Sequence, residues 1–429
     1  MLTIILIFTV ILILGIFIAW PELSLYAMAF FIPVIGWSFY IKNMVIPFID
    51  LVSLLALAAF ALRLAYQSLF TVRQKIKLKW PLLFPFALFI IAASLSAVFS
   101  PEPYYSLYYI ARWLLFLYFA YIFLPYNLIT SGKTLKRAIG ALVLGALAVL
   151  ANGYISLLGQ DWRDSFFRLK SIPIFGVYPY DENQNLIAEF LNVGAFLILA
   201  LRILSKEIRM KRFLDLLFVL TSLGIVLTFS RAGWITLALQ ILIYAFYFLR
   251  RKNLSWKNYL PIIFGLIIIF SPLIWKMTQL QKENTSSTED RWLLTTISLQ
   301  ALTNKPYLGY GSGEFINLVA ENIRFRVKYG EPIDSHGILQ KVAAENGLIG
   351  LAALSFLFAV LFKMAYQSLK KYQAANPWLL PLILAGAGGL FFQLFNTSYY
   401  KGKVWLPIAV ALAAIRLLDA KYDRQENKN

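Results

Sequence analysis

The chain has 429 residues, of which 60% are hydrophobic and 14% are charged, whereas a soluble domain has roughly half and a quarter. This composition excludes an ordinary soluble domain. The formal net charge is +19, and the chain has one histidine and no cysteine. Disulfides and thiolate chemistry are therefore excluded, and a zinc site would lack its usual ligands.

Apolar runs of about 20 residues, the length that a helix needs to cross the hydrocarbon layer, recur along the sequence. The alternating segments of an outer-membrane barrel are absent. We therefore predict an all-α fold, a polytopic bundle of about twelve transmembrane helices. The candidate spans are 2–19, 23–41, 45–66, 82–99, 105–124, 138–158, 185–203, 213–229, 232–249, 258–275, 341–362, 378–396 and 404–418.

The N-terminal end of the chain does not fit a simple count of crossings. The first run lacks a basic start and a small-residue cleavage site, so we expect a retained helix. Thirteen spans would put the N-terminus outside and twelve would put it inside. Pro21 and Pro33 indicate that one of the first runs is broken or interfacial, which favours twelve full crossings.

Lysine and arginine clusters occur at every second junction between the apolar runs, as the positive-inside rule requires of cytoplasmic loops. The clusters lie at 73–79, 133–137, 202–212, 250–257, 363–371 and 416–428. Topology and contact with anionic membrane lipids explain this charge, so no nucleic-acid partner is invoked. The extracytoplasmic face then receives the turn at Ser230-Arg231 and the segments 100–104, 159–184, 276–340 and 397–403.

The segment 276–340 is the longest break in the apolar pattern. Loops of this length are usually functional or disordered, but this one has apolar residues at helical spacing, from Arg291 to Leu302 and again from Phe315 to Ile323. We predict amphipathic helices on the outer membrane face. The chain is thus divided into transmembrane helices at 1–275, an extracytoplasmic catalytic loop at 276–340, and transmembrane helices with a short cytoplasmic tail at 341–429.

Two arginines on the predicted outer face could hold an anion. Arg231 follows one apolar run and precedes another, and Arg291 lies in Asp290-Arg291-Trp292. Arg231 could equally be a snorkelling interfacial residue, and Arg291 a solvated or salt-bridged surface residue. The functional interpretation is that each guanidinium binds a phosphate or carboxylate through its planar fork. Glycines at 309–313 indicate a tight turn and close backbone approach, with an anion-binding nest as one outcome.

The single histidine, His336, lies where the long loop re-enters the membrane. Its unperturbed pKa suits base catalysis near neutrality. We expect Asp334 or Ser335 to be the N-cap of the re-entering helix, so that His336 lies in the first turn, where a helix N-terminus keeps the ring neutral. Glu345, deeper in the same helix, is either a buried structural partner or an acid facing a cavity, and the structural role is favoured.

Six short motifs follow one another along the chain: Asn185-Leu186-Ile187-Ala188, Ser230-Arg231-Ala232-Gly233, Asp290-Arg291-Trp292, Asn304-Lys305-Pro306-Tyr307-Leu308-Gly309-Tyr310-Gly311, Ser335-His336-Gly337-Ile338-Leu339-Gln340 and Glu345-Asn346-Gly347-Leu348-Ile349-Gly350. In this order they resemble the O-antigen ligase and polymerase family of polytopic enzymes that handle polyprenyl-diphosphate-linked glycans. The resemblance covers about residues 180 to 350, and elsewhere rests on hydropathy alone. Gly337 departs from the asparagine that often follows this histidine in the family.

The resemblance implies a helical fold of the lipid-sugar glycosyltransferase type and an inverting transfer that needs no metal or other cofactor. It implies that His336 is the general base, that Arg231 and Arg291 bind the donor diphosphate, and that Glu345 and Asn185 support the site. The partners would be a polyprenyl-diphosphate-linked glycan donor, a glycan or glycolipid acceptor, and membrane lipids. The location would be the cytoplasmic (inner) membrane, with the active site on its extracytoplasmic face.

Two questions stay open at this point. The acceptor could be a second lipid-linked repeat, as for a polymerase, or a lipid core or wall polymer, as for a ligase. The alternative function is a secondary transporter of a small anion or sugar, because transporters carry intramembrane charges on broken helices. The candidate groups here gather at one face rather than at mid-depth, which favours the enzyme. Arg163, Arg168 and Lys170, on another outer loop, either assist with substrate charge or are simply solvated.

Overall fold

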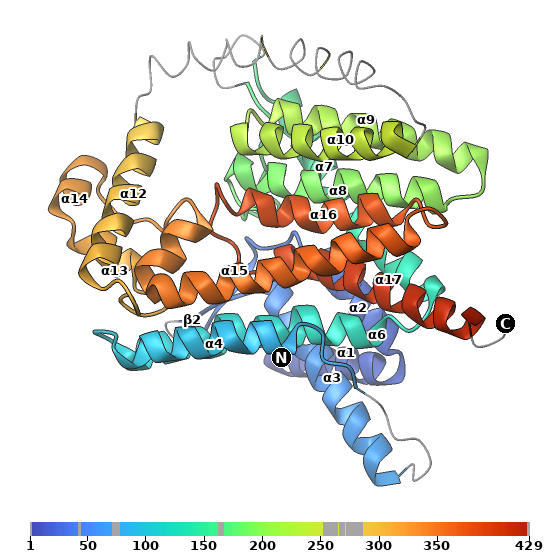
Figure 1. Ribbon diagram of the computed structural model, residues 1–429, viewed down its shortest axis with the longest axis horizontal. Helices are drawn as coiled ribbons and strands as arrows, with labels where there is room; N and C mark the ends of the chain where they lie inside the picture. Colours follow the sequence, from blue (N-terminus) through green and yellow to red (C-terminus); the bar gives the residue numbers. More distant parts are fainter. Residues whose placement is uncertain are drawn as a thin grey trace.

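The computed structural model describes residues 2–41, 44–70, 78–161, 167–251, 265, 271 and 286–426, and most of them are helical (Figure 1). The helices are α1 Leu2–Ala19, α2 Pro21–Phe31, α3 Phe48–Phe70, α4 Leu83–Val98, α5 Pro103–Tyr109, the π-helices η1 Ile110–Leu115 and η2 Tyr118–Phe123, α6 Leu124–Leu128, α7 Gly132–Leu158, α8 Gln184–Leu204, α9 Ile208–Leu227, α10 Arg231–Arg251, α12 Ser286–Asn304, α13 Phe315–Glu321, α14 Ile323–Tyr329, α15 Ile338–Tyr372, α16 Leu379–Phe392 and α17 Gly402–Glu426.

Within these residues, six helical segments are long and apolar enough to cross a membrane, or seven if the bent pair α1 and α2 is one span. The six are α3, the continuous segment from α5 to α6, α7, α8, the segment Arg231–Phe248 of α10, and α15. A polytopic helical membrane protein is therefore confirmed, but the predicted number of about twelve is not. α4 and α16 are apolar but have only 16 and 14 residues, and the predicted span 258–275 lies outside the described residues.

The N-terminal prediction was right about the break at Pro21 and wrong about the segment after it. α1 and α2 meet at an angle of 118°, at the position where Pro21 begins α2. The predicted span 23–41 is not one helix, because α2 ends at Phe31, two residues before Pro33, which has no backbone N–H to continue it. Strand β1 Ser38–Ile41 then pairs antiparallel with β2 Met44–Pro47. The prediction of a purely α fold is corrected by this hairpin.

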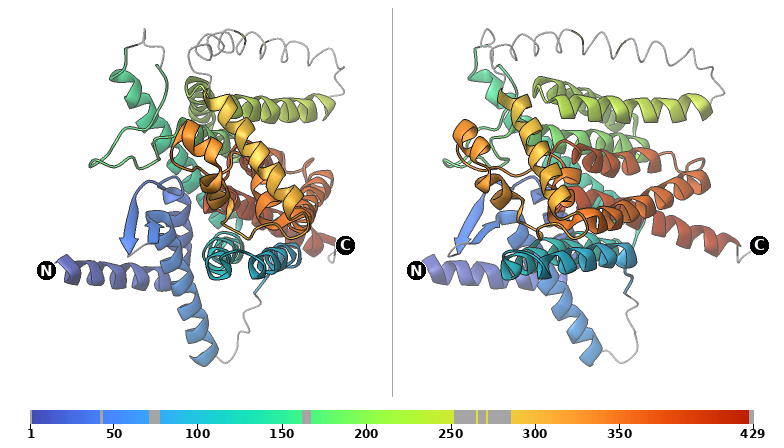
Figure 2. Two further views of the ribbon diagram at one scale, coloured as in Figure 1. Left: turned by 90° about the vertical axis from the view of Figure 1, so that its left-hand side faces the viewer. Right: turned by 60° about the vertical axis from the view of Figure 1, so that its left-hand side comes forward.

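The long helices lie side by side around α8, most of which is buried. α8 packs against α7, α9 and α16, and Figure 1 shows α8, α9, α10, α15 and α16 running in nearly the same direction. Helices α12, α13 and α14 cover one end of this bundle, and the C-terminus lies at the other end. Figure 2 shows α1 projecting from the side of the bundle, with the N-terminus at its free end. The bundle thus has two distinct ends.

Helix α15 is broken near its beginning, and the break is built into the fold. Gly347 has φ +61° and ψ −160°, a conformation that only glycine adopts easily. The N–H of Leu348 donates to the Pro306 carbonyl at 2.8 Å, and the Glu345 carbonyl accepts from the N–H of Gly311 at 2.8 Å. Because the backbone groups freed by the break are paired with the loop after α12, that loop fixes the short first part of α15.

Candidate active site

His336 lies in the loop before α15, not in its first turn. The N-cap residue is Gly337, without a side-chain cap, so the predicted cap at Asp334 or Ser335 is wrong. Both side chains have other partners: Asp334 Oδ1 accepts from Lys341 Nζ at 2.6 Å, and Ser335 Oγ donates to the Gly337 carbonyl at 2.9 Å. The histidine is therefore held by a short, hydrogen-bonded loop.

Gly337 is needed where it stands. A Cβ at this position would lie 2.9 Å from the Leu394 carbonyl oxygen, which is closer than a real Cβ approaches an oxygen. The neighbouring N–H of Ile338 donates to the Gln393 carbonyl at 2.8 Å. The loop between α16 and α17 thus passes directly beside the histidine, and this contact explains why the chain has glycine rather than asparagine here.

Arg291 is positioned by hydrogen bonds between α12 and the first part of α15. Gln340 Nε2 donates to Thr295 Oγ1 at 2.6 Å, and Ser298 Oγ donates to the Gln340 carbonyl at 2.6 Å. Thr295 is one turn beyond Arg291 on α12, and its Oγ1 also bonds the Arg291 carbonyl at 2.7 Å. Gln340 is one turn beyond His336 in the chain. The two elements that hold the predicted base and the predicted cation are therefore tied together.

Arg231 is the first residue of α10, and the residue before it fixes its place. Ser230 Oγ donates to Asn185 Oδ1 at 2.7 Å and accepts from the N–H of Gly233 at 3.2 Å. The turn is strained, because Phe229 has φ +54°. Asn185 therefore holds the turn that presents Arg231. A cation at a helix N-terminus opposes the helix dipole and destabilises the helix. An anion bound at this position would interact favourably with both the dipole and the arginine.

Arg231 acts electrostatically on Arg291, and Arg291 acts on His336, so we call these three residues the arginine–histidine cluster. Burial lowers the pKa of Arg291, and the charge of Arg231 lowers it further. Burial and then the charge of Arg291 lower the pKa of His336, while Asp290 opposes this. Among the described residues, neither arginine has a carboxylate within 4.0 Å. Arg291 thus links the other two members electrostatically, and the lowered pKa of His336 favours the neutral imidazole.

Beside it lies a second group, the lysine–carboxylate cluster of Lys341, Asp334 and Glu345. Lys341 Nζ is 2.6 Å from Asp334 Oδ1 and 3.1 Å from Glu345 Oε1. Glu345 is fully buried, and its Oε1 also accepts from the N–H of Phe315 at 3.2 Å. These contacts support the structural role expected of Glu345, because its charge is neutralised within the protein.

In the glycine-rich segment 309–313, two backbone amides that an anion nest would use are already hydrogen-bonded within the protein. The N–H groups of Tyr310 and Gly311 donate to the carbonyls of Ala344 and Glu345, at 3.0 and 2.8 Å. A Cβ at Gly309 would lie 2.5 Å from the Glu345 carbonyl carbon. The predicted close backbone approach is confirmed, but its partner is the broken helix α15 rather than a ligand.

A buried ion pair in the bundle was not predicted. Lys403 Nζ lies 2.5 Å from Glu189 Oε2, and both side chains are almost completely buried. Gln393 and Asn396 donate to the same carboxylate at 2.8 and 3.1 Å. A signal existed in the sequence, since Glu189 interrupts an apolar run one turn after Asn185. This pair joins α8 and α17 to the loop that passes His336.

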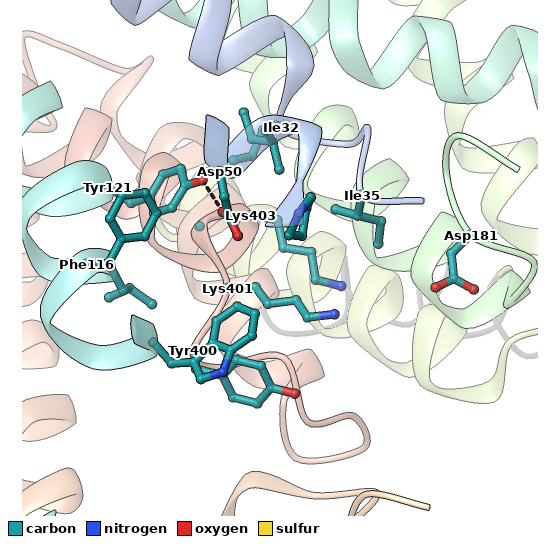
Figure 3. Close-up of a pocket in the computed structure, with 14 residues that line it drawn as sticks. Ile32, Ile35, Asp50, Phe116, Tyr121, Asp181, Tyr400, Lys401 and Lys403 are labelled. Carbon is teal, nitrogen blue, oxygen red and sulfur yellow. Dashed lines mark hydrogen bonds between the residues drawn. The ribbon is translucent and has the colours of Figure 1, made fainter. Parts of the chain in front are cut away.

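Close to this pair is a small cavity of about 60 Å³, also not predicted, which is partly open to solvent. Figure 3 shows the side chains of Lys401 and Lys403 running side by side into it, with Asp181 across the space. Tyr121 donates to Asp50 Oδ1 at 2.8 Å on its inner wall. Its lining residues are Ile32, Ile35, Pro47, Ile49, Asp50, Trp113, Phe116, Leu117, Tyr121, Asp181, Tyr400, Lys401, Gly402 and Lys403.

The other basic residues predicted to assist lie on the loop between α7 and α8. Arg163 lies outside the described residues. The backbone of Arg168 bonds the Gln160 side chain at 3.0 and 3.1 Å, and burial lowers the pKa of the Arg168 guanidinium. Lys170 is exposed, and its N–H donates to Ser156 Oγ at 3.2 Å. These bonds anchor the loop to the end of α7, and an assisting role stays a prediction.

Residues 216–355 match the O-antigen ligase family. The match contains Arg231, Arg291, His336 and Glu345, whereas Asn185 precedes it. A ComP-specific O-oligosaccharyltransferase from Acinetobacter baylyi (strain ATCC 33305 / BD413 / ADP1) is 29% identical over 154 residues, which cover 34% of this chain and 28% of the relative. This chain therefore matches less than a third of that relative. Together with the apolar helices, these similarities confirm the predicted resemblance and a membrane protein with a segment similar to the O-antigen ligase family.

Proposed function

We propose that the protein is a membrane glycosyltransferase that moves a glycan from polyprenyl diphosphate to a hydroxyl group of an acceptor glycan or glycolipid, in surface polysaccharide biosynthesis. One observation carries the proposal: Arg291, which has no ion-pair partner among the described residues, acts electrostatically on both Arg231 and the single histidine, and hydrogen bonds with Gln340 tie its helix to the histidine segment. The O-antigen ligase match and the O-linked transfer in the name of the relative support the same type of reaction.

In this mechanism His336 is the general base. Its lowered pKa keeps the imidazole neutral at neutral pH, so a ring nitrogen can accept the proton of the acceptor hydroxyl. The hydroxyl oxygen then forms a bond to the anomeric carbon, while the bond from that carbon to the diphosphate oxygen breaks. The electron pair leaves with polyprenyl diphosphate. Attack opposite the leaving group inverts the configuration at the anomeric carbon.

Arg231 and Arg291 bind the leaving diphosphate. The negative charge on the bridging oxygen grows as the glycosidic bond breaks, and guanidinium groups that are already in place stabilise it more strongly in the transition state than in the bound substrate. Each planar fork can also hold two phosphate oxygens at once. We propose that these two cations supply the charge stabilisation and that the transfer needs neither a metal ion nor another cofactor.

We further propose a location in the cytoplasmic (inner) membrane with the site on its extracytoplasmic face. The basic segments at 202–212, 363–371 and 416–428 favour a cytoplasmic location for the end of the bundle that carries the C-terminus. The site and helices α12 to α14 are at the other end (Figures 1 and 2). The segment 276–340 is then the catalytic loop between the transmembrane parts 1–275 and 341–429.

The alternative function is secondary transport of a small anion or sugar. The buried pairs Lys403–Glu189 and Lys341–Glu345 are the observation that favours it, because charges inside transmembrane helices often mark a transport pathway. Both pairs are, however, neutralised within the protein. Proteoliposomes separate the two functions, since a transporter would show substrate flux without a covalent product.

The test is transfer by the purified protein in proteoliposomes, with polyprenyl-diphosphate glycan and acceptor. His336→Ala should lower the transfer rate by about 10²–10⁴-fold, the usual contribution of a general base, at an unchanged amount of folded protein in the membrane. Its matched control is Gln300→Ala, an exposed polar residue on α12, which should retain activity. Full activity of His336→Ala would remove the histidine from the mechanism.

A further inference from the structure

The cavity between Asp50, Trp113 and Lys401 lies one loop away from the proposed base. The loop between α16 and α17 contacts the His336 segment at Gly337, and it ends in Tyr400 and Lys401, which line the cavity. Tyr400 Oη also donates to Asp334 Oδ2 at 3.3 Å. The proposed base and the cavity are therefore connected by this loop and by the Tyr400–Asp334 hydrogen bond.

Among the described residues, the charged groups that line the cavity form no ion pair with one another, although Asp50 accepts a hydrogen bond from Tyr121. Among the described residues, no carboxylate lies within 4.0 Å of the Lys401 ammonium, although Asp50 and Asp181 line the same space. Lys403 is already neutralised by Glu189. Charges that are partly removed from water without a mutual partner destabilise the fold. A ligand that both donates and accepts hydrogen bonds would satisfy the two carboxylates and the ammonium together.

One wall of the cavity has an unusual backbone. Trp113 belongs to the π-helix η1 and Tyr121 to the π-helix η2, and both line the cavity. π-Helical turns are rare and occur frequently at functional sites, because they redirect side chains from their α-helical positions. The rings of Trp113 and Tyr400 lie 5.2 Å apart, which adds an aromatic surface beside the charged groups.

From these observations we infer that the cavity is a saccharide subsite, which binds a sugar unit of the glycan next to the one that reacts. The carboxylate of Asp50 accepts hydrogen bonds from sugar hydroxyl groups, the Lys401 ammonium donates to hydroxyl oxygens, and the Trp113 ring packs against an apolar face of the sugar. A polyhydroxylated ligand fits this set better than a simple anion, since two carboxylates line the cavity. The inference rests on the proposed function for the identity of the ligand as a glycan.

The experiment measures binding without catalysis. The probe is the oligosaccharide released by mild acid from the polyprenyl-linked glycan of the source cells, titrated into the purified full-length protein and followed by saturation-transfer NMR. Lys401→Met and Asp50→Asn should each weaken binding about tenfold or more, the usual effect of losing a charged hydrogen-bond partner. Lys305→Met is the matched control, since Lys305 is also half-buried but contacts Tyr310 and Phe99 instead of the cavity, and it should bind like the wild type.

Lys401→Met should weaken binding to the same extent in a His336→Ala background, which separates this inference from the proposed function. If His336→Ala remained active in transfer while Lys401→Met still weakened binding, the catalytic proposal would fail and the subsite would stand. Unchanged binding in Lys401→Met would overturn the subsite, even if Asp50→Asn failed to fold. A wild-type protein that showed no binding at about 10 mM oligosaccharide, well above the millimolar range of weak specific complexes, would also overturn it.

Discussion

The arginine–histidine cluster and the lysine–carboxylate cluster lie next to each other, but only in the second is cationic charge neutralised by ion pairs. In the lysine–carboxylate cluster the Lys341 ammonium is within 3.1 Å of Asp334 and Glu345 oxygens, so the protein neutralises its own buried charge. In the arginine–histidine cluster two cations stand near each other without an ion pair among the described residues. The lysine–carboxylate cluster therefore stabilises the fold, whereas the arginine–histidine cluster could bind an anionic ligand.

The largest expected effect is on stability, in the lysine–carboxylate cluster. Lys341→Met should lower the free energy of unfolding by about 3–5 kcal/mol, because Glu345 would be left as a buried charge without its cation. Thermal or denaturant unfolding in detergent measures this. The double variant Lys341→Met with Glu345→Gln should be more stable than Lys341→Met alone. If Lys341→Met lowered the free energy of unfolding by less than about 1 kcal/mol, the usual value for an exposed pair, the stabilising role of this cluster would be contradicted.

The next effect is on catalysis, in the arginine–histidine cluster. Arg231→Lys should lower kcat/KM for glycan transfer about 10²-fold at unchanged stability, because a point charge cannot replace two directed hydrogen bonds to the diphosphate. Arg202→Lys is the matched control, since Arg202 pairs with Asp215 at 2.7 Å and both are well exposed. Equal rates for Arg231→Lys and Arg202→Lys would show that Arg231 acts only as a surface charge.

The smallest expected effect is on the pKa of His336, the single histidine. NMR of the His336 ring, in protein without a histidine tag, should give a pKa below the usual 6.5, because of burial and Arg291. Arg291→Gln should raise this pKa, since the imidazolium would lose a repelling neighbour, and Asp290→Asn should lower it further. Transfer activity should rise with pH through the lowered pKa, as the base form appears. Shifts in the same direction for both variants would contradict the proposed electrostatics.

Local patterns in the sequence were sufficient to predict many of the helices. The apolar runs that became α7, α8 and α10 were placed within a few residues, except that α7 begins six residues earlier than expected. Such helices need only an apolar segment of sufficient length, which is a local property. The break at Pro21 was also foreseen, since proline disrupts a helix wherever it stands. The hairpin after α2 was missed because its strands are as apolar as a span.

The position of the cap at α15 and the role of the glycine-rich loop could not be predicted in this way. Asp334 is a good N-cap by residue type, but in the folded protein its carboxylate pairs with Lys341. The amides of Gly311 and its neighbour look available in the sequence, yet they bond the carbonyls at the break of α15. In each case the group that forms the actual bond comes close to the residue only in the folded protein, so the local sequence does not reveal it.

By itself, the sequence determined that this is a helical membrane protein, and it identified the three polar residues that form the candidate site, because membrane burial and reactive side chains are properties of residue type. Only the tertiary structure decided which charges are neutralised and which are left open. Lys341 and Lys403 form ion pairs with carboxylates, whereas Arg231 and Arg291 have no ion-pair partner among the described residues. The physical reason is that electrostatic energy depends on distance and burial, and both are fixed by how remote segments pack.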